Sequence, residues 1–152
     1  EDELIIKNDF QFKKNIVDGP IMLEVDATMI SQALINLLKN AGESIASRMS
    51  KGEAPIVSGQ IKVIAKLLDN FLKVSIVDNG SGLPEDRARL FEPYVTTREN
   101  GTGLGLAIVK KIIEEHGGTF RLEDAAQYKN SGIVGAAAII EIPIHSEKSN
   151  KD

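Results

Sequence analysis

The chain has 152 residues, of which 42% are hydrophobic and 26% charged, with a formal net charge of −4 and no cysteine. This size and apolar content favour one compact domain with its own core. The net negative charge excludes a general attraction to nucleic acid or anionic lipid, so any anion site would have to be local. The lack of cysteine excludes disulfides and thiolate metal sites.

No segment of the sequence reads as a membrane span or a signal peptide. The longest apolar stretch, GIVGAAAIIEIPI, is interrupted by Glu141 and is shorter than the roughly 20 residues that a membrane helix needs. Because the chain begins EDELIIKND without methionine, we expect it to be a piece of a longer protein. We predict one domain over residues 1–145 and a frayed polar tail over 146–152.

The first half of the chain predicts a strand followed by a long helix. IMLEVD (21–26) is typical of a short strand that ends at an acidic residue. From residue 27 to about 49, apolar residues recur at helical spacing and form one stripe, which consists of Met29, Ile30, Ala33, Leu34, Leu37, Leu38, Ala41 and Ile45. SKGEAP then ends the helix with glycine and proline.

The second half predicts two pairs of strands with a helix between them. QIKVIAKLLDNFLKVSIVD alternates on both sides of Asp69-Asn70, which predicts a hairpin ending at Asp78. Leu104–His116 reads as an amphipathic helix stopped by Gly117 and Gly118, and TFRLEDA and GAAAIIEIPI as two closing strands. This order predicts an α+β fold with a mixed sheet and helices stacked on one face.

Three polar residues lie on one flank of the first predicted helix. Asn36 and Asn40 are four residues apart, beside the apolar stripe, and Glu43 follows closely. Such a pair is explained either by solvent exposure or by metal binding, because a carboxamide oxygen is a hard, neutral ligand suited to a magnesium ion that arrives with phosphate. The pair alone does not decide between the two.

An acidic residue followed by alternate glycines ends the predicted hairpin. Asp78 precedes Asn79, Gly80, Ser81 and Gly82, which by itself is consistent with a simple turn. The glycines also clear side chains from the backbone and would let a flat ring approach. An ionised carboxylate only accepts hydrogen bonds, so it would suit the amine of adenine and repel the carbonyl of guanine.

GTGLGL puts Gly101, Gly103 and Gly105 at the start of a helix, where free backbone amides form an anion site. A dinucleotide fingerprint is disfavoured because Leu106 follows where glycine is needed and no strand directly precedes. A Walker-type loop lacks its Gly-Lys-Ser or Gly-Lys-Thr. A calcium loop over DNGSGLPEDRAR has Arg89 where the closing glutamate belongs.

Residues 83–100 form a long charged loop between these two glycine clusters, and such loops are often functional. Thr97 and Arg98 lie just before the second cluster, where a hydroxyl and a guanidinium would suit a terminal phosphate, although an ordinary solvated charge is an equal explanation for Arg98. We predict a mobile lid over a bound nucleotide.

The motifs NLLKNAGES (36–44), DNGSG (78–82), FEPYVTT (91–97) and GTGLGLAIVKKIIEEHGG (101–118), with the closing strands, resemble the N, G1, F and G2 boxes of sensor histidine kinases. Their ATP-binding domain belongs to the GHKL superfamily of gyrase, the Hsp90 chaperones and the MutL proteins. The resemblance covers about residues 21–144 and is greatest to the NtrY-type and NtrB-type nitrogen-regulation kinases. It implies a two-layer Bergerat-type sandwich whose ATP lid spans about 83–100.

The resemblance also implies a role for each matching residue. Asn40 would coordinate Mg²⁺ and Asn36 would support the phosphates or the metal. Asp78 would bind the adenine amino group in a pocket shaped by Gly80 and Gly82. Glu43 would also lie at the nucleotide site. The remaining phosphate contacts would come from Thr97, Arg98, Gly101, Thr102, Gly103, Leu104, Gly105 and Leu106. Two departures are Ala136, where many relatives have threonine, and Glu43, where some have lysine, so that Arg98 would carry more of the phosphate contact.

Asn36 separates a kinase from an ATPase in this superfamily. Hydrolytic relatives have a glutamate there as general base, and an amide cannot accept the proton. We therefore expect Asn36, Asn40 and Arg98 to serve transfer of the γ-phosphoryl group to a histidine on a separate helical dimerisation domain. Neither His116 nor His145 has the acidic residue directly after it that the phosphoacceptor usually has, so both are expected to be structural or incidental.

The resemblance implies a cytoplasmic domain, whose parent is membrane-bound in the NtrY type, with a response regulator as an indirect partner and no nucleic-acid partner. Since dimerisation belongs to the separate helices, this piece is expected to be a monomer. Two other hypotheses stay open: a nucleotide-binding regulatory module without transfer, and a slow ATPase.

Overall fold

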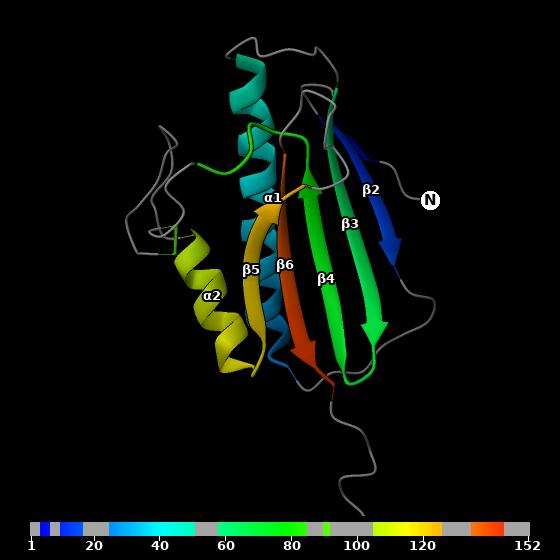
Figure 1. Cartoon of the computed structure of the whole chain (residues 1–152), viewed down its shortest axis with the longest axis vertical. Coiled ribbons are helices and arrows are strands. Elements are labelled where there is room, and N and C mark those ends of the chain that lie inside the picture. The colour runs from blue at the N-terminus through cyan, green and yellow to red at the C-terminus, as the bar shows by residue number, and fades with distance from the viewer. Residues whose placement is uncertain are drawn as a thin grey trace, which may run out of the picture.

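The computed structural model describes residues 4–6, 10–16, 25–50, 58–84, 90–91, 105–125 and 135–144. Within these residues the chain forms six strands and two helices (Figure 1). In chain order they are β1 (Leu4–Ile6), β2 (Phe10–Ile16), α1 (Ala27–Ser50), β3 (Gly59–Leu68), β4 (Phe71–Asp78), α2 (Gly105–Glu115), β5 (Thr119–Asp124) and β6 (Ala136–Pro143).

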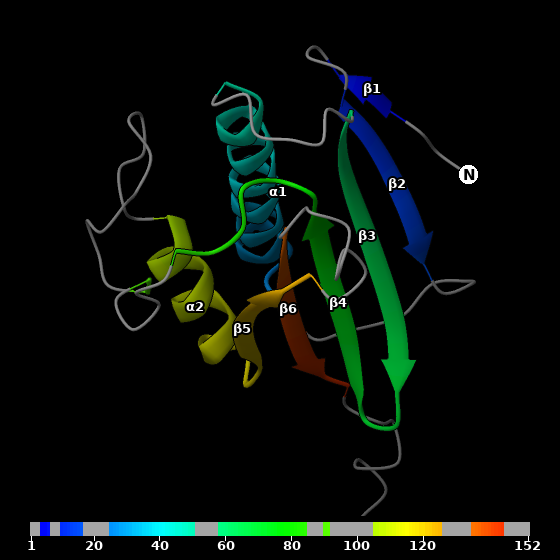
Figure 2. The same cartoon turned by 45° about the horizontal axis from the view of Figure 1, so that its top comes forward.

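The strands form one mixed sheet in the order β1-β2-β3-β4-β6-β5. The β2–β3 pair is parallel and the other pairs are antiparallel. Both helices lie on one side of the sheet, with α1 passing behind β5 and β6 (Figure 1), and a tilted view separates the two layers and shows β1 (Figure 2). The predicted α+β two-layer fold is confirmed.

Strands β1 and β2 were not predicted, since the first strand was expected at residues 21–26. Within that range, Val25 and Asp26 are not in a strand, and residues 21–24 lie outside the described part of the chain. Asp26 instead caps α1, since its Oδ1 accepts from the Met29 amide at 3.1 Å and its carbonyl accepts from the Ile30 amide at 2.9 Å.

The predicted central hairpin is confirmed by the pairing of β3 with β4. Leu68 lies opposite Phe71, so Asp69 and Asn70 form a two-residue turn, and Asp69 has the positive φ of 38° that such tight turns require. The burial of β4 increases toward its end, where Asp78 is buried. The hairpin therefore places the carboxylate of Asp78 in the interior, at one end of the sheet.

Helix α2 spans Gly105–Glu115 and ends one residue before the predicted end at His116, while the predicted start, Leu104, lies outside the described residues. The amides of Gly117 and Gly118 donate to the carbonyls of Glu114 and Ile113 at 3.0 and 2.9 Å, and Gly117 has a positive φ of 75°, so the glycines end the helix as expected. His116 links both helices: Nδ1 lies 2.7 Å from the Ile112 carbonyl, and Nε2 accepts from the Asp26 amide at 3.0 Å. Its role in this structure is to hold the fold together.

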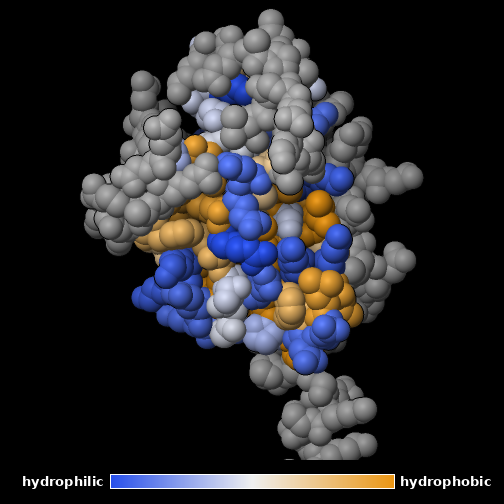
Figure 3. Space-filling view, viewed as in Figure 1, coloured by the Kyte–Doolittle hydropathy of each residue, from blue (hydrophilic) through white to orange (hydrophobic). Residues whose placement is uncertain are grey.

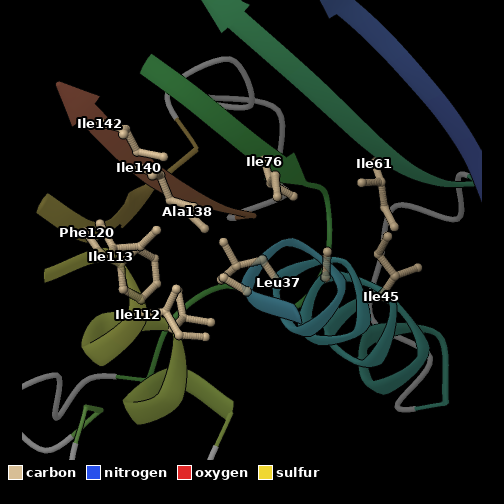
Figure 4. Packing of buried hydrophobic residues seen from close by; sticks show 13 residues of the cluster. Leu37, Ile45, Ile61, Ile76, Ile112, Ile113, Phe120, Ala138, Ile140 and Ile142 are labelled. Atoms are coloured by element: carbon tan, nitrogen blue, oxygen red, sulfur yellow. The ribbon is translucent and has the colours of Figure 1, made fainter. Parts of the chain in front are cut away.

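The core lies between the helices and the sheet. Its fully buried members include Val109 and Ile113 of α2, Ile45 of α1 and Ile140 of β6. Figure 4 shows the labelled side chains of both helices and of the strands pointing into this shared space. A smaller cluster of Val77, Ala125, Ala137 and Ile139 is also buried. The predicted apolar stripe of α1 therefore faces the sheet.

The face of the sheet turned away from the helices carries a band of hydrophilic residues (Figure 3). Arg121 of β5 pairs with Glu141 of β6 and also approaches Glu123 at 3.4 Å. The hydrogen bond with Glu141 raises the pKa of the Arg121 guanidinium, which therefore stays protonated. No helix among the described residues has the length and apolarity needed to cross a membrane.

Candidate functional site

A cavity of about 300 Å³ lies between α1, the start of α2 and the ends of β4 and β6. Its walls come from segments far apart in the sequence, because the antiparallel β4–β6 pair brings Asp78 opposite Ala136. The lining consists of Leu37, Asn40, Ala41, Ser44, Ser47, Ile76, Asp78, Ser81, Gly82, Leu83, Pro84, Leu90, Leu106, Leu122, Ala136 and Ala138. Aliphatic side chains and a set of polar side chains line it together, and the polar ones are Asn40, Ser44, Ser47, Asp78 and Ser81. Polar groups among apolar walls are typical of small-molecule sites.

Asp78 is the only acidic residue that lines the cavity among the described residues, and it is 5% exposed. Its Oδ1 accepts a hydrogen bond from the Gly80 amide at 2.8 Å, which orients the carboxylate. Ala136, the residue opposite it, also lines the cavity and contributes only a methyl group, so this wall stays open beside the carboxylate. A buried carboxylate here can recognise a hydrogen-bond donor.

The loop after Asp78 packs directly against α1, and Gly80 makes this possible. A Cβ added at Gly80 would lie 2.3 Å from the Ser44 Oγ and 2.6 Å from the Ser44 backbone carbon. The Ser81 amide donates to the Ser44 hydroxyl at 3.1 Å and to its carbonyl at 3.3 Å. Gly82 follows with a φ of 83°, a conformation that favours glycine. The two glycines therefore serve close packing and loop geometry.

A buried arginine and a buried asparagine anchor the same loop. Asn79, 1% exposed, accepts from the Gln60 amide at 2.7 Å through Oδ1 and donates to the Ser58 carbonyl at 3.0 Å through Nδ2. Arg48, 3% exposed, donates from Nε to the Asn79 carbonyl at 2.7 Å. Neither residue was predicted to have a function. Their bonds tie the end of β4 to both β3 and α1 and so position Asp78.

Asn40 lies at the other end of the cavity. It lines the cavity, and its side-chain nitrogen is buried. A Cβ added at Gly105, the first residue of α2, would lie 3.8 Å from the Asn40 Oδ1, so the start of α2 faces this amide. An amide side chain and a helix N-terminus are thereby brought together, and the backbone amides of such a terminus favour anions.

The predicted site residues are only partly gathered in this cavity. Asn40, Asp78, Gly82 and Leu106 line it, while Gly80 and Gly105 lie beside lining residues. Asn36 and Glu43 are not among the lining residues, and Asn36 borders a separate open hollow on α1. The other predicted phosphate contacts lie outside the described residues, and they are Thr97, Arg98, Gly101, Thr102, Gly103 and Leu104. The same holds for most of the predicted lid, apart from residues 83–84 and 90–91.

The walls of the cavity were less predictable than its polar ends. Leu37 and Ala41 belong to the predicted apolar stripe of α1, and Ile76 and Leu122 to predicted strands. The spacing of apolar residues therefore predicted that they are buried, but not that they line a cavity. Ser44 and Ser47 also line the cavity, although neither was predicted as a site residue; Ser44 is the last residue of the NLLKNAGES motif. The result is a cavity with apolar and hydroxyl-bearing walls, a carboxylate at one end and an amide beside a helix N-terminus at the other. Such a cavity suits a flat heterocycle with an exocyclic amine and an anionic tail.

Residues 25–146 match the family described as histidine kinase-, DNA gyrase B- and HSP90-like ATPase. Nitrogen regulation protein NtrY of Azorhizobium caulinodans is 53% identical over 111 residues, which are 71% of this chain and 14% of that protein. The sensory histidine kinase/phosphatase NtrB of Rhodobacter capsulatus is 42% identical over 109 residues, covering 66% of this chain and 29% of that protein. The chain thus spans only a small part of these relatives.

Among solved structures, the nucleotide-free catalytic domain of histidine kinase ThkA superposes with a TM-score of 0.70 at 34% identity, covering 91% of this chain and 81% of that chain. ThkA in complex with the response regulator protein TrrA matches with a TM-score of 0.68 at 31% identity, over 93% of this chain and 36% of that chain. The chain belongs to the family of histidine kinase-, DNA gyrase B- and HSP90-like ATPases, as an ATP-binding catalytic domain of a sensor histidine kinase of the two-component type.

Proposed function

We propose that this domain, over residues 1–145, binds Mg-ATP and donates the γ-phosphoryl group to a histidine on a separate helical dimerisation domain of the same kinase. The observation that carries the proposal is the cavity that joins Asp78 at one end to Asn40 and the start of α2 at the other. The similarity to NtrY and NtrB supports the same reading, in a nitrogen-regulation branch of the family.

The described residues fit an adenine nucleotide. Asp78 would accept a hydrogen bond from the adenine amino group, and apolar walls such as Ile76 and Leu122 would contact the faces of the ring. The same carboxylate would repel the carbonyl of guanine, which provides selectivity as well as affinity. Gly80 and Gly82 would serve this recognition indirectly, by letting the loop lie flat against α1.

The opposite end of the cavity fits the triphosphate. The backbone amides at the start of α2, from Gly105 and Leu106, would contribute positive potential, and we propose that Thr97, Arg98 and the glycines upstream add further donors. Asn40 would bind magnesium through its carboxamide oxygen, with Asn36 and Glu43 in support. When bound, magnesium neutralises the charge that develops on the phosphates during transfer.

Transfer is favoured over hydrolysis because the helix that borders the cavity offers no general base at Asn36. An amide does not accept a proton from water at neutral pH. In the proposed reaction the bond between the γ-phosphorus and the bridging oxygen breaks, and a phosphorus–nitrogen bond forms with the imidazole of the acceptor. ADP leaves, and the imidazole ends as phosphohistidine. The domain's own His116 is held by Asp26 and Ile112 in the fold and is not proposed as acceptor.

The partners of the whole kinase follow from this role. We propose that the phosphohistidine is consumed by a response regulator and that the isolated domain is a monomer, since dimerisation would belong to the helical domain. Because ATP is available inside the cell, the domain would work on the cytoplasmic side, wherever its parent is anchored.

The test combines binding and transfer. The domain is titrated with ATP and magnesium by calorimetry, and then incubated with the separated helical domain and ATP labelled at the γ-phosphate. Acid-labile label on a histidine of the helical domain is the expected result. Binding without transfer would instead favour a regulatory module, and rapid release of labelled phosphate without acceptor would favour an ATPase.

A further inference from the structure

The exposed side of the first half of α1 has no charge. Residues 27–38 contain no Asp, Glu, Lys or Arg, although 26% of the whole chain is charged. Helix α2, by comparison, exposes Lys111, Glu114 and Glu115. The exposed positions in the first half of α1 are Ala27, Thr28, Ser31, Gln32 and Ile35. Depletion of charge from an exposed surface is typical of the central part of a protein interface.

Ile35 is the most conspicuous residue of this surface. It is 57% exposed, the highest value among the large hydrophobic residues of the described part of the chain. Together with Asn36 and the four other exposed residues of this segment, it lines an open hollow on α1, which we name the α1 hollow. A half-exposed isoleucine in a hollow offers a partner apolar area to bury.

The α1 hollow lies next to the phosphate end of the nucleotide cavity. Asn36, which borders the hollow, lies one helical turn before Asn40, which lines the cavity and faces Gly105. Four residues correspond to about 6 Å along a helix axis. A molecule that fills the hollow would therefore lie close to the γ-phosphoryl group of an ATP bound in the cavity.

We infer that the α1 hollow is the docking surface for the apolar face of the helix that carries the acceptor histidine. This inference rests on the proposed phosphotransfer function. Transfer requires the acceptor nitrogen to come within about 3–3.5 Å of the phosphorus, so the partner must lie against the surface beside the phosphates. An uncharged surface accepts an apolar helix face without leaving charges buried and unpaired. The chain spans 14% of NtrY, so in that relative ample chain lies outside the matched segment.

The first test inserts a charge into the hollow of the full-length kinase. Ile35→Glu places a carboxylate where the partner's apolar face would be buried, and it should lower the rate of histidine phosphorylation at least about tenfold. Affinity for a fluorescent ATP analogue should stay within about twofold of the unaltered kinase, because Ile35 does not line the nucleotide cavity. Ile35→Val should retain transfer, since it keeps an apolar contact.

Leu67→Glu is the matched control. Leu67 is 53% exposed, almost as much as Ile35, but lies near the tip of the β3–β4 hairpin, so its charge should leave transfer unchanged. Equal transfer by the Ile35→Glu and unaltered kinases would overturn the inference while leaving the proposed function intact. If the unaltered kinase binds ATP but forms no phosphohistidine, the proposed function fails and the inference fails with it.

A cross-linking experiment identifies the occupant directly. This chain has no cysteine, so Ile35→Cys creates a single thiol in the domain for a photoreactive group. Irradiation of the full-length kinase should link position 35 to the helix that bears the phosphorylated histidine, whereas Leu67→Cys should not. A cross-link from position 35 to a second copy of this domain would contradict the inference. The absence of any cross-link to the helical domain would contradict it as well.

Discussion

Asp78 depends on its neighbours for its position as much as on the strand that ends with it. The Gly80 amide orients its carboxylate, and the bonds from Asn79 and Ser81 fix the loop on β3 and α1. A carboxylate in a loop this firmly held is preorganised, so little ordering should be needed when a ligand binds.

Asp78→Asn should weaken ATP binding by about 10- to 100-fold, because a hydrogen bond to a charged group contributes about 1.5–3 kcal/mol. The asparagine can still accept from the Gly80 amide through its Oδ1, so the thermal midpoint of the unliganded domain should change little. Calorimetric titration and a thermal melt measure the two effects. An affinity within about twofold of the unaltered domain would remove Asp78 from adenine recognition.

Gly80→Ala should destabilise the domain by about 1–3 kcal/mol, because the new methyl group meets the backbone of Ser44, which cannot rotate away. Gly105→Ala is the matched control for stability, since its methyl group would meet the nearest atom, the Asn40 Oδ1, at an ordinary 3.8 Å. Denaturant unfolding compares the two variants. Equal stability of both would show that the loop does not pack against α1 as closely as described.

At the scale of elements, α1 both packs against the sheet and holds the loop that follows β4. One side packs on the sheet through Leu37 and Ile45, while Ser44 and Arg48 hold the loop after β4. Since Leu37 and Asn40 also line the cavity, any shift of α1 against the sheet would change the cavity as well as the core. Stability and nucleotide affinity are therefore expected to be coupled through this helix.

Arg48→Met tests that coupling. It keeps an apolar stem of similar length but removes the bond to the buried Asn79 carbonyl, so we expect a loss of about 1–3 kcal/mol in stability and a lower affinity for ATP. Lys39→Met, at an exposed position of the same helix, should change neither quantity. The prediction fails if Arg48→Met loses stability but binds ATP as tightly as the unaltered domain, because α1 would then support the core alone.

The elements with strong local patterns were predictable from sequence. The apolar stripe of α1, the Asp69-Asn70 turn and the Gly117-Gly118 stop each determine local structure, and all three are confirmed. Strand β2 was missed because FQFKKNI has a weak alternation and its parallel pairing with β3 depends on residues more than 40 positions away. Asp26 was predicted to end a strand, but it caps a helix, and an acidic residue suits either position.

Site residues that belong to short sequence motifs were predictable. Site residues that act through packing against distant parts of the chain were not. Asp78 and Asn40 stand in distinctive motifs, and both line the cavity. Arg48 and Ser44 act through contacts with residues more than 30 positions away, for which the sequence has no local pattern. Asn36 shares a helix flank with Asn40, yet it borders the α1 hollow instead of the cavity, because one helical turn separates the two surfaces.

At the scale of the whole molecule, ATP and magnesium should stabilise the domain together. A ligand at about 100 times its dissociation constant adds about 2.7 kcal/mol to the free energy of unfolding. The thermal midpoint of the domain with ATP should therefore be higher with magnesium than with a chelator. Asn40→Ala should reduce that difference, since the proposed metal ligand is gone. An unchanged magnesium effect in this variant would assign the metal to other groups.

The central claim is that one cavity holds adenine at Asp78 and phosphates at Asn40 and the start of α2. The most direct measurement is a crystal structure of the domain with magnesium and a non-hydrolysable ATP analogue. The account predicts the adenine amino group within hydrogen-bond distance of the Asp78 carboxylate and the triphosphate beside Asn40 and Gly105. A base bound elsewhere, with the cavity between α1 and β4 left without nucleotide, would contradict it.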